Sequence, residues 1–193
     1  MKQKRWISLL TAGVLAIGLV LTGCAPAQQP GSQPESSSQV EESSQEPETK
    51  VPTLYIGTVD AEGNGSFQEY PFVGSGKVTP EALIAAMAEL TGWNLTLSAE
   101  DPVTTGKGGM TVSFASESAI FTGPPIEQKE EFHLYSADQL CYTIFDSVQK
   151  TLQENFSPEN PGALDIYYCT DGSGEIELGQ LGVVLPLDES YSN

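Results

Sequence analysis

The residues best suited to acid–base chemistry in this chain of 193 residues cluster around its single histidine. His133 closely follows Glu130 and Glu131, and carboxylates beside an imidazole can serve as a general acid and base. One histidine excludes the zinc motifs that need two. The segment therefore supports one enzyme hypothesis, a hydrolase whose cleft gathers these three side chains, and it predicts no metal site.

A cysteine nucleophile would require His133 to meet Cys141 or Cys169. Cys141 falls on the apolar stripe of a predicted helix, where cysteine usually serves as a small buried side chain. Cys169 ends the segment LDIYYC and faces away from the core if Ile166 and Tyr168 face inward. Side chains that face apart form neither a catalytic dyad nor a disulfide. We therefore predict two free thiols and a protein that is not an enzyme.

Two glycine-rich loops resemble ligand loops but fail on spacing. Thr104–Met110, TTGKGGM, lacks the first glycine and the final Ser or Thr of a phosphate loop, and it leads into an alternating strand instead of a helix. Asp60–Gly65, DAEGNG, matches half of a calcium loop, but the twelfth position holds Pro71 in place of glutamate. We interpret both as turns, the second with Asn64 and Gly65 at its tip, and expect no cofactor.

The first residues read as an export signal. Basic residues at positions 2, 4 and 5 precede an apolar stretch that is short for a membrane span. The stretch ends in a lipobox, as in bacterial lipoproteins, made of Leu21, Thr22, Gly23 and Cys24. We predict that residues 1–23 are a signal peptide and that Cys24 carries a lipid on the outer face of the cell membrane. An uncleaved amino-terminal anchor would leave the domain on the same side.

The mature chain is strongly acidic and contains no arginine. Removing residues 1–23 takes away three of the eight basic residues and none of the 26 acidic ones. Nucleic acids and anionic membrane faces both need cationic contacts, so both are excluded as partners. Residues 24–50 are rich in Ser, Gln, Glu and Pro and contain Val40 as their one large apolar side chain, which predicts a disordered tether. Residues 51–193 suit a single domain.

Two helices are predicted from their caps and apolar stripes. Thr79 can cap a helix over residues 80–91 that ends before Gly92. Ser136 can cap a second helix that fades near Asn155, with Tyr135 as part of a hydrophobic staple. Its apolar stripe comprises Leu140, Cys141, Ile144, Val148 and Leu152.

Alternation of apolar and polar residues predicts strands that have one packed and one solvated face. It is clear in segments 93–98, 110–114 and 175–178, and further strands are expected at 53–58, 67–73 and 164–169. Such a pattern is typical of antiparallel or mixed sheets covered on one side. We predict an α+β fold in which two helices pack on one face of a small antiparallel or mixed sheet.

The ordered segments LYIGTVD, FQEYPF, TPEALIAAMAELTGWN, GGMTVSF, SADQLCYTIFDSVQKTLQENF and LDIYYCTDG resemble the GerMN domain of sporulation and spore-germination lipoproteins of Gram-positive bacteria. The resemblance covers most of residues 51–180, above all the glycine-rich step into a strand and the helix with Ser147, Thr151 and Leu152. It implies a compact two-helix domain that acts in envelope or spore assembly, and it supplies no catalytic residue. The chain has one copy where the germination protein has two in tandem, which leaves a role in sporulation open.

Two non-enzymatic functions compete with the hydrolase. The first is a membrane-anchored interaction module that binds envelope proteins or further copies of itself through an exposed sheet face or edge. Its candidate residues are Thr111, Ser113, Tyr167 and Cys169. The alternative is a module that binds cell-wall glycan (peptidoglycan) by stacking sugars on Trp93, Tyr55 or Tyr70, although Trp93 shares a face with Leu95 and Leu97 and thus suits the core.

Overall fold

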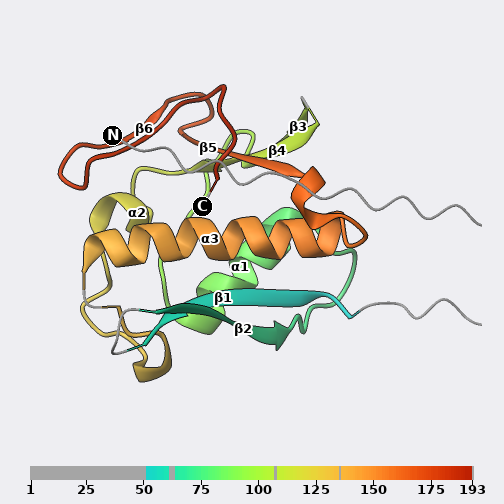
Figure 1. Cartoon of the computed structure of the whole chain (residues 1–193), viewed down its shortest axis with the longest axis horizontal. Coiled ribbons are helices and arrows are strands. Elements are labelled where there is room, and N and C mark those ends of the chain that lie inside the picture. Colours follow the sequence, from blue (N-terminus) through green and yellow to red (C-terminus); the bar gives the residue numbers. More distant parts are fainter. Residues whose placement is uncertain (1–50, 61–63, 107, 135, 193) are drawn as a thin grey trace, which may run out of the picture. The chain divides into compact units, whose positions relative to one another are not determined.

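A β-hairpin opens the part of the chain that the structure describes. The computed structural model describes residues 51–60, 64–106, 108–134 and 136–192, all of which lie within one compact unit, Pro47–Asn193. The predicted signal peptide, lipobox, Cys24 and tether lie outside these residues. The elements follow in the order β1 (Thr53–Val59), β2 (Gly65–Pro71), α1 (Pro80–Thr91), β3 (Val103–Gly106), β4 (Gly109–Phe114), α2 (Ala119–Thr122), η1 (Glu130–Phe132), α3 (Ala137–Phe156), η2 (Pro161–Ala163), β5 (Asp165–Thr170), β6 (Ile176–Leu178) and β7 (Val183–Leu185) (Figure 1).

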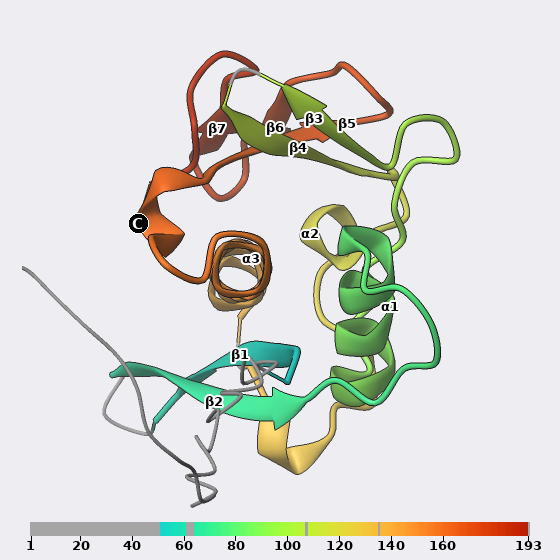
Figure 2. The ribbon, with the colours of Figure 1, turned by 90° about the vertical axis from the view of Figure 1, so that its right-hand side faces the viewer.

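The α+β class is confirmed, and the strands divide among three small sheets. β1 and β2 form an antiparallel hairpin, β6 and β7 form a second one, and β3, β4 and β5 form a sheet in which β4 and β5 run parallel. Seen along its axis, α3 lies between the β1–β2 hairpin and the β3–β4–β5 sheet, with α1 and α2 beside it (Figure 2). The core fills the spaces around α3, and the predicted stripe of that helix is fully buried.

Local capping determines where both long helices begin. In α1 the Thr79 hydroxyl accepts a hydrogen bond from the Ala82 amide at 3.2 Å, and Gly92 ends the helix in the left-handed region with φ 81°. In α3 the Ser136 hydroxyl accepts from the Gln139 amide at 3.5 Å. The predicted bounds of α1 are confirmed, and α3 ends at Phe156, close to the expected Asn155. The staple residue Tyr135 lies outside the described residues.

Segment 93–98 was predicted as a strand but does not form one. Trp93 and Leu95 are buried while Asn94 and Thr96 are exposed, as the alternation predicts, but Ser98, expected to face solvent, is buried. Its ladder, however, is limited to a single bridge between Leu97 and Phe114. The Asn94 side chain accepts a hydrogen bond from the Thr96 amide at 3.1 Å, and such a local bond competes with strand pairing.

The two glycine-rich loops are turns between strands, as predicted. Within Thr104–Met110 the first three residues belong to β3 and the last two to β4, and Gly108 adopts φ 82° between the strands. Lys107 lies outside the described residues. In the first hairpin the Asp60 carboxylate accepts from the Asn64 amide at 2.7 Å and from its side-chain nitrogen at 2.9 Å. Asn64 directly precedes β2 and Gly65 is its first residue, so β2 begins two residues before the predicted range.

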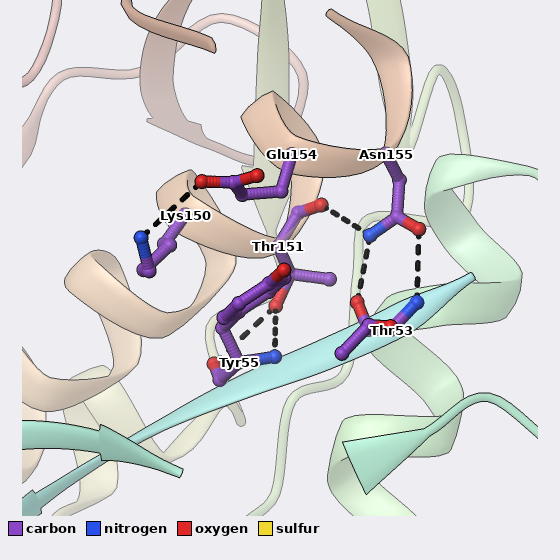
Figure 3. A network of polar contacts seen from close by, with 6 residues as sticks. All are labelled: Thr53, Tyr55, Lys150, Thr151, Glu154 and Asn155. Carbon is purple, nitrogen blue, oxygen red and sulfur yellow. Dashed lines mark hydrogen bonds and ion pairs between the residues drawn. The ribbon is translucent and has the colours of Figure 1, made fainter. Parts of the chain in front are cut away.

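Polar side chains of α3 take the place of a neighbouring strand along β1 (Figure 3). The amides of Thr53, Tyr55 and Gly57 donate to the side-chain oxygens of Asn155, Thr151 and Ser147 at 3.0, 2.9 and 2.8 Å. Asn155 and Thr151 also donate back to the carbonyls of Thr53 and Tyr55, at 2.7 and 3.3 Å. We call this set of contacts the α3–β1 ladder.

The α3–β1 ladder exists because two backbone repeats nearly match. Four residues of an α-helix rise about 6.0 Å, and two residues of a strand rise about 6.6–6.8 Å. A helix that runs antiparallel to the strand can therefore present every fourth side chain to every second amide. Gly57 permits the close approach, since a Cβ atom there would lie 3.0 Å from the Thr143 methyl carbon and 3.3 Å from the Ser147 hydroxyl.

Replacement of Thr151 by Val should destabilise the domain, because it leaves the buried Tyr55 amide without an acceptor. The free energy of unfolding should fall by roughly 1–3 kcal/mol, the cost of an unsatisfied buried donor. Thr151→Ser keeps the hydroxyl and should cost at most about 1 kcal/mol, for one lost methyl group. Urea unfolding of the chain from residue 25 onward measures both. The proposed role of the α3–β1 ladder would be contradicted if Thr151→Val were as stable as the parent, or if it lost less free energy of unfolding than Thr151→Ser.

Candidate functional site

The predicted acid–base residues lie together beside a small surface cavity. Glu130 and Glu131 belong to η1, His133 follows it, and all three side chains are exposed. With residues 57–59 of β1 they line a cavity of about 120 Å³. Ligand sites typically have volumes of about 300–1,000 Å³. The cavity is small for a glycan or a peptide, which does not favour the hydrolase hypothesis.

Glu131 is engaged by a tyrosine of the hairpin. The Tyr70 hydroxyl donates to the Glu131 carboxylate, and the Tyr70 ring packs edge-on against Phe132. Burial, then the hydrogen bond and the negative charge of Glu131, raise the pKa of Tyr70 to about 12. Tyr70 therefore stays protonated at neutral pH and holds η1 against β2.

The two cysteines in the described part of the chain are free, as predicted, but Cys169 does not face solvent. Its surroundings explain the difference, because loops cover the outer face of β4 and β5. The Ser113 hydroxyl lies 2.7 Å from that of Ser98 and accepts from the Gly172 amide at 2.7 Å. Burial raises the pKa of Cys169, and burial with nearby Asp138 raises that of Cys141 to about 12. Neither thiol has the lowered pKa of a nucleophile.

The prediction of an exposed interaction face on β4 and β5 is therefore wrong. Ser113 is 1 % exposed and Cys169 is also buried, whereas Thr111 and Tyr167 are partly exposed. Alternation correctly assigned Ile166 and Tyr168 to the core. It could not show that a second layer of loops covers the opposite face.

The aromatic residues proposed to stack on sugars are mostly buried. Trp93 is 3 % exposed and packs edge-on against Phe132, and Tyr55 is 6 % exposed. Tyr70 is partly buried and bonded to Glu131. Among the described residues, the aromatic side chains that are open to solvent are instead Tyr142 and Phe67, at 45 % and 39 % exposure.

An unpaired sheet edge lies on β2. In the described part of the chain β1 is the one strand that pairs with β2, and nearly every β2 side chain is exposed. The amides of Tyr55 and Gly57 point to α3, so the pairs that these residues form with Glu69 and Phe67 are the non-hydrogen-bonded ones. The backbone N–H and C=O groups of Phe67 and Glu69 consequently point outward, away from β1.

A lysine from α3 covers the face of the hairpin next to this edge. The Lys150 amine lies 5.0 Å from the centre of the Tyr55 ring and 5.4 Å from that of Phe67, within cation–π distance. The same amine is 3.4 Å from the Glu154 carboxylate (Figure 3). These contacts hold the side chain of Phe67 beside the open edge and leave its backbone free to pair.

A second polar cluster lies at the carboxyl end of the chain. The Tyr191 hydroxyl donates to the Asp146 carboxylate at 2.6 Å, and the Tyr191 amide donates to the Ile166 carbonyl at 2.7 Å. Burial raises the pKa of Asp146 although the hydrogen bond from Tyr191 lowers it. Burial and the neighbouring carboxylate raise the pKa of Tyr191 well above its usual range. The cluster fixes the terminal segment along β5.

The chain has no match among protein-family models, curated proteins or solved structures. Within the described ranges, no three His, Cys, Asp or Glu side chains are grouped so that they could hold a metal ion. None of the helices in the same ranges has both the length and the apolar character of a membrane span. The outward-facing backbone groups of Phe67 and Glu69 make the edge of β2 the candidate site that the geometry favours.

The raised pKa of Asp146 predicts a pH-dependent stability. The native state holds this proton more tightly than the unfolded chain, so the contribution is present at acid pH and is lost as pH rises through the native pKa. Asp146→Asn cannot titrate, yet it keeps an oxygen that can accept from Tyr191. Between about pH 4 and pH 8 the free energy of unfolding of the parent should fall relative to that of Asn. Urea unfolding of both proteins at several pH values measures the free energy of the parent minus that of Asp146→Asn. If this quantity stays constant or rises with pH, the raised pKa of Asp146 is contradicted.

Proposed function

We propose that the protein is a lipid-anchored envelope protein whose domain is a non-catalytic interaction module, and that β2 binds an extended segment of a partner protein. The observation that carries the proposal is the outer edge of the seven-residue strand β2, which no strand of the described residues pairs. Its partner β1 has its own second edge occupied by α3. Added strands gain affinity from main-chain hydrogen bonds, and exposed edges are the usual sites of such pairing.

Charge restricts the class of partner. The formal net charge of the whole sequence is −18, and two of the lysines in the described residues are engaged in contacts within the domain. Like charges repel, so a basic segment is favoured over an acidic one. The resemblance to GerMN domains supports a role in envelope or spore assembly, with the tether holding the domain away from the membrane.

Glycan binding is the alternative function, and one observation favours it. The exposed ring of Tyr142 lines a cavity of about 270 Å³ together with Tyr191 and Glu189. Sugars stack on open aromatic faces and bond to carboxylates, so this cavity replaces Trp93 and Tyr55 as the glycan candidate. We rank it second because the cavity is small and the hydroxyl of Tyr191, which also lines it, is already bonded to Asp146.

Lipid attachment at Cys24 should be visible by metabolic labelling. Cells that express the full chain and are fed a radioactive fatty acid should incorporate label into the protein, because the lipobox directs modification of this cysteine. Cys24→Ser removes the thiol and should abolish the label. An unlabelled parent protein recovered from the cytosol would contradict the proposed location.

Strand addition predicts binding that depends on one amide. Random peptides displayed on phage are selected on the full chain in mild detergent and then tested on Phe67→Pro and Phe67→Ala. Both variants lose the ring, but only Pro loses the outward N–H, and proline is tolerated on edge strands. Selected peptides should bind the parent and Ala variants and lose at least about tenfold in affinity for Pro, or about 1.4 kcal/mol.

Two outcomes would contradict the proposed function. One is that no peptide is enriched, and the other is that enriched peptides bind the Pro and Ala variants equally. Pelleting of the protein with purified peptidoglycan, lost in Tyr142→Ala and retained in Phe67→Pro, would favour the glycan alternative.

A further inference from the structure

One cavity near β2 lies where that strand meets α1. Its volume is about 570 Å³, and its lining includes Tyr70, Pro71 and Val73 from the hairpin side and Ala86 and Leu90 from α1. Val73 is 93 % exposed at this cavity, an apolar side chain that the described residues leave uncovered. The cavity thus shares Tyr70 and Pro71 with the free edge.

Side-chain alternation relates this cavity to one face of an added strand. Tyr70 and Leu54 pair across the hairpin, and both line the cavity, whereas Phe67 and Glu69 project to the opposite face. A strand that pairs with β2 places every second side chain on the Tyr70 face. The side chain that comes to lie beside Tyr70 would therefore be next to the cavity.

The charged groups around the cavity are two carboxylates and one ammonium group, so negative charge is in excess. Glu89 lines it, and Glu131 lies against Tyr70 on the same side of the hairpin. The amine of Lys129, which also lines the cavity, is used by the last carbonyls of α1, since it donates to the carbonyl of Glu89 at 3.0 Å and to that of Leu90. A basic group that enters with the strand would meet carboxylates at this face.

We propose that the partner of β2 is an extended segment whose bulky apolar side chain occupies this cavity, flanked on the same face by basic side chains. The inference rests on the proposed strand addition and adds its specificity, since pockets for alternate side chains distinguish one added strand from another. The tether of this chain does not fit the description, because residues 24–50 carry five glutamates and one large apolar side chain, Val40. A second copy of the acidic domain would meet like charge.

Synthetic peptides test the apolar anchor with the full chain in mild detergent. The probe TKTLTKT alternates so that its leucine and both lysines share one face, and TKTATKT differs in the anchor alone. We expect fluorescence anisotropy to show the leucine peptide binding at least about tenfold more tightly than the alanine peptide. The acidic peptide TETLTET should bind more weakly than TKTLTKT, and that difference should shrink as salt is added.

Two variants of α1 provide matched controls. Ala86→Leu fills the cavity and should abolish the advantage of the leucine peptide, while Ala85→Leu adds the same side chain at an exposed position that does not line this cavity and should leave the advantage intact. Both keep a good helix former in α1. Circular dichroism checks that both variants fold.

The outcomes separate this inference from the proposed function. If both peptides bind the Phe67→Ala variant and lose affinity for Phe67→Pro, but the leucine gives no advantage or Ala86→Leu has no effect, the anchor is wrong and strand addition stands. Binding that ignores the Phe67 amide overturns both. Absence of any binding by TKTLTKT up to about 1 mM, a free energy near 4 kcal/mol, also overturns the anchor. Self-association lost in Phe67→Pro would overturn it in favour of a second copy.

Discussion

Three side chains of one helix replace a strand, and the rest of the domain depends on this substitution. Ser147, Thr151 and Asn155 satisfy the amides of β1 that no strand pairs, and unpaired amides would be costly in a buried position. The same contacts fix the rotation of α3, so its apolar stripe packs into the core and Lys150 lies over the hairpin. Because β1 is occupied on both sides, the free edge of the hairpin belongs to β2.

The acidic surface and the open edge together suggest how the domain discriminates between partners. Lys129 binds the carboxyl end of α1 and Lys150 binds aromatic rings and Glu154, so both serve the fold. Carboxylates remain on both faces of β2, with Glu69 on one and Glu131 on the other. The β2 edges of two copies therefore repel each other electrostatically, which limits edge-to-edge association, whereas a basic strand is attracted.

The features that could be predicted from the sequence are those set by interactions between residues close together in the chain. The ends of α1 and the start of α3 were predictable because their caps, Thr79 and Ser136, act within one turn. The α3–β1 ladder was not, because polar residues spaced by four read as a solvated helix face unless the opposite strand is known. Burial of Ser113 and Cys169 likewise depends on distant loops. The free edge follows from strand pairing, which alternation does not reveal.

Amide hydrogen exchange along the hairpin, followed residue by residue by NMR, tests the central claim most directly. The α3–β1 ladder predicts slow exchange at Tyr55 and Gly57, whose amides are bonded to α3. Along β2 it predicts alternation, with slow exchange at Gln68 and Tyr70 and exchange near the free-peptide rate at Phe67 and Glu69. Uniform protection along β2, or fast exchange at Tyr55 and Gly57, would contradict the account.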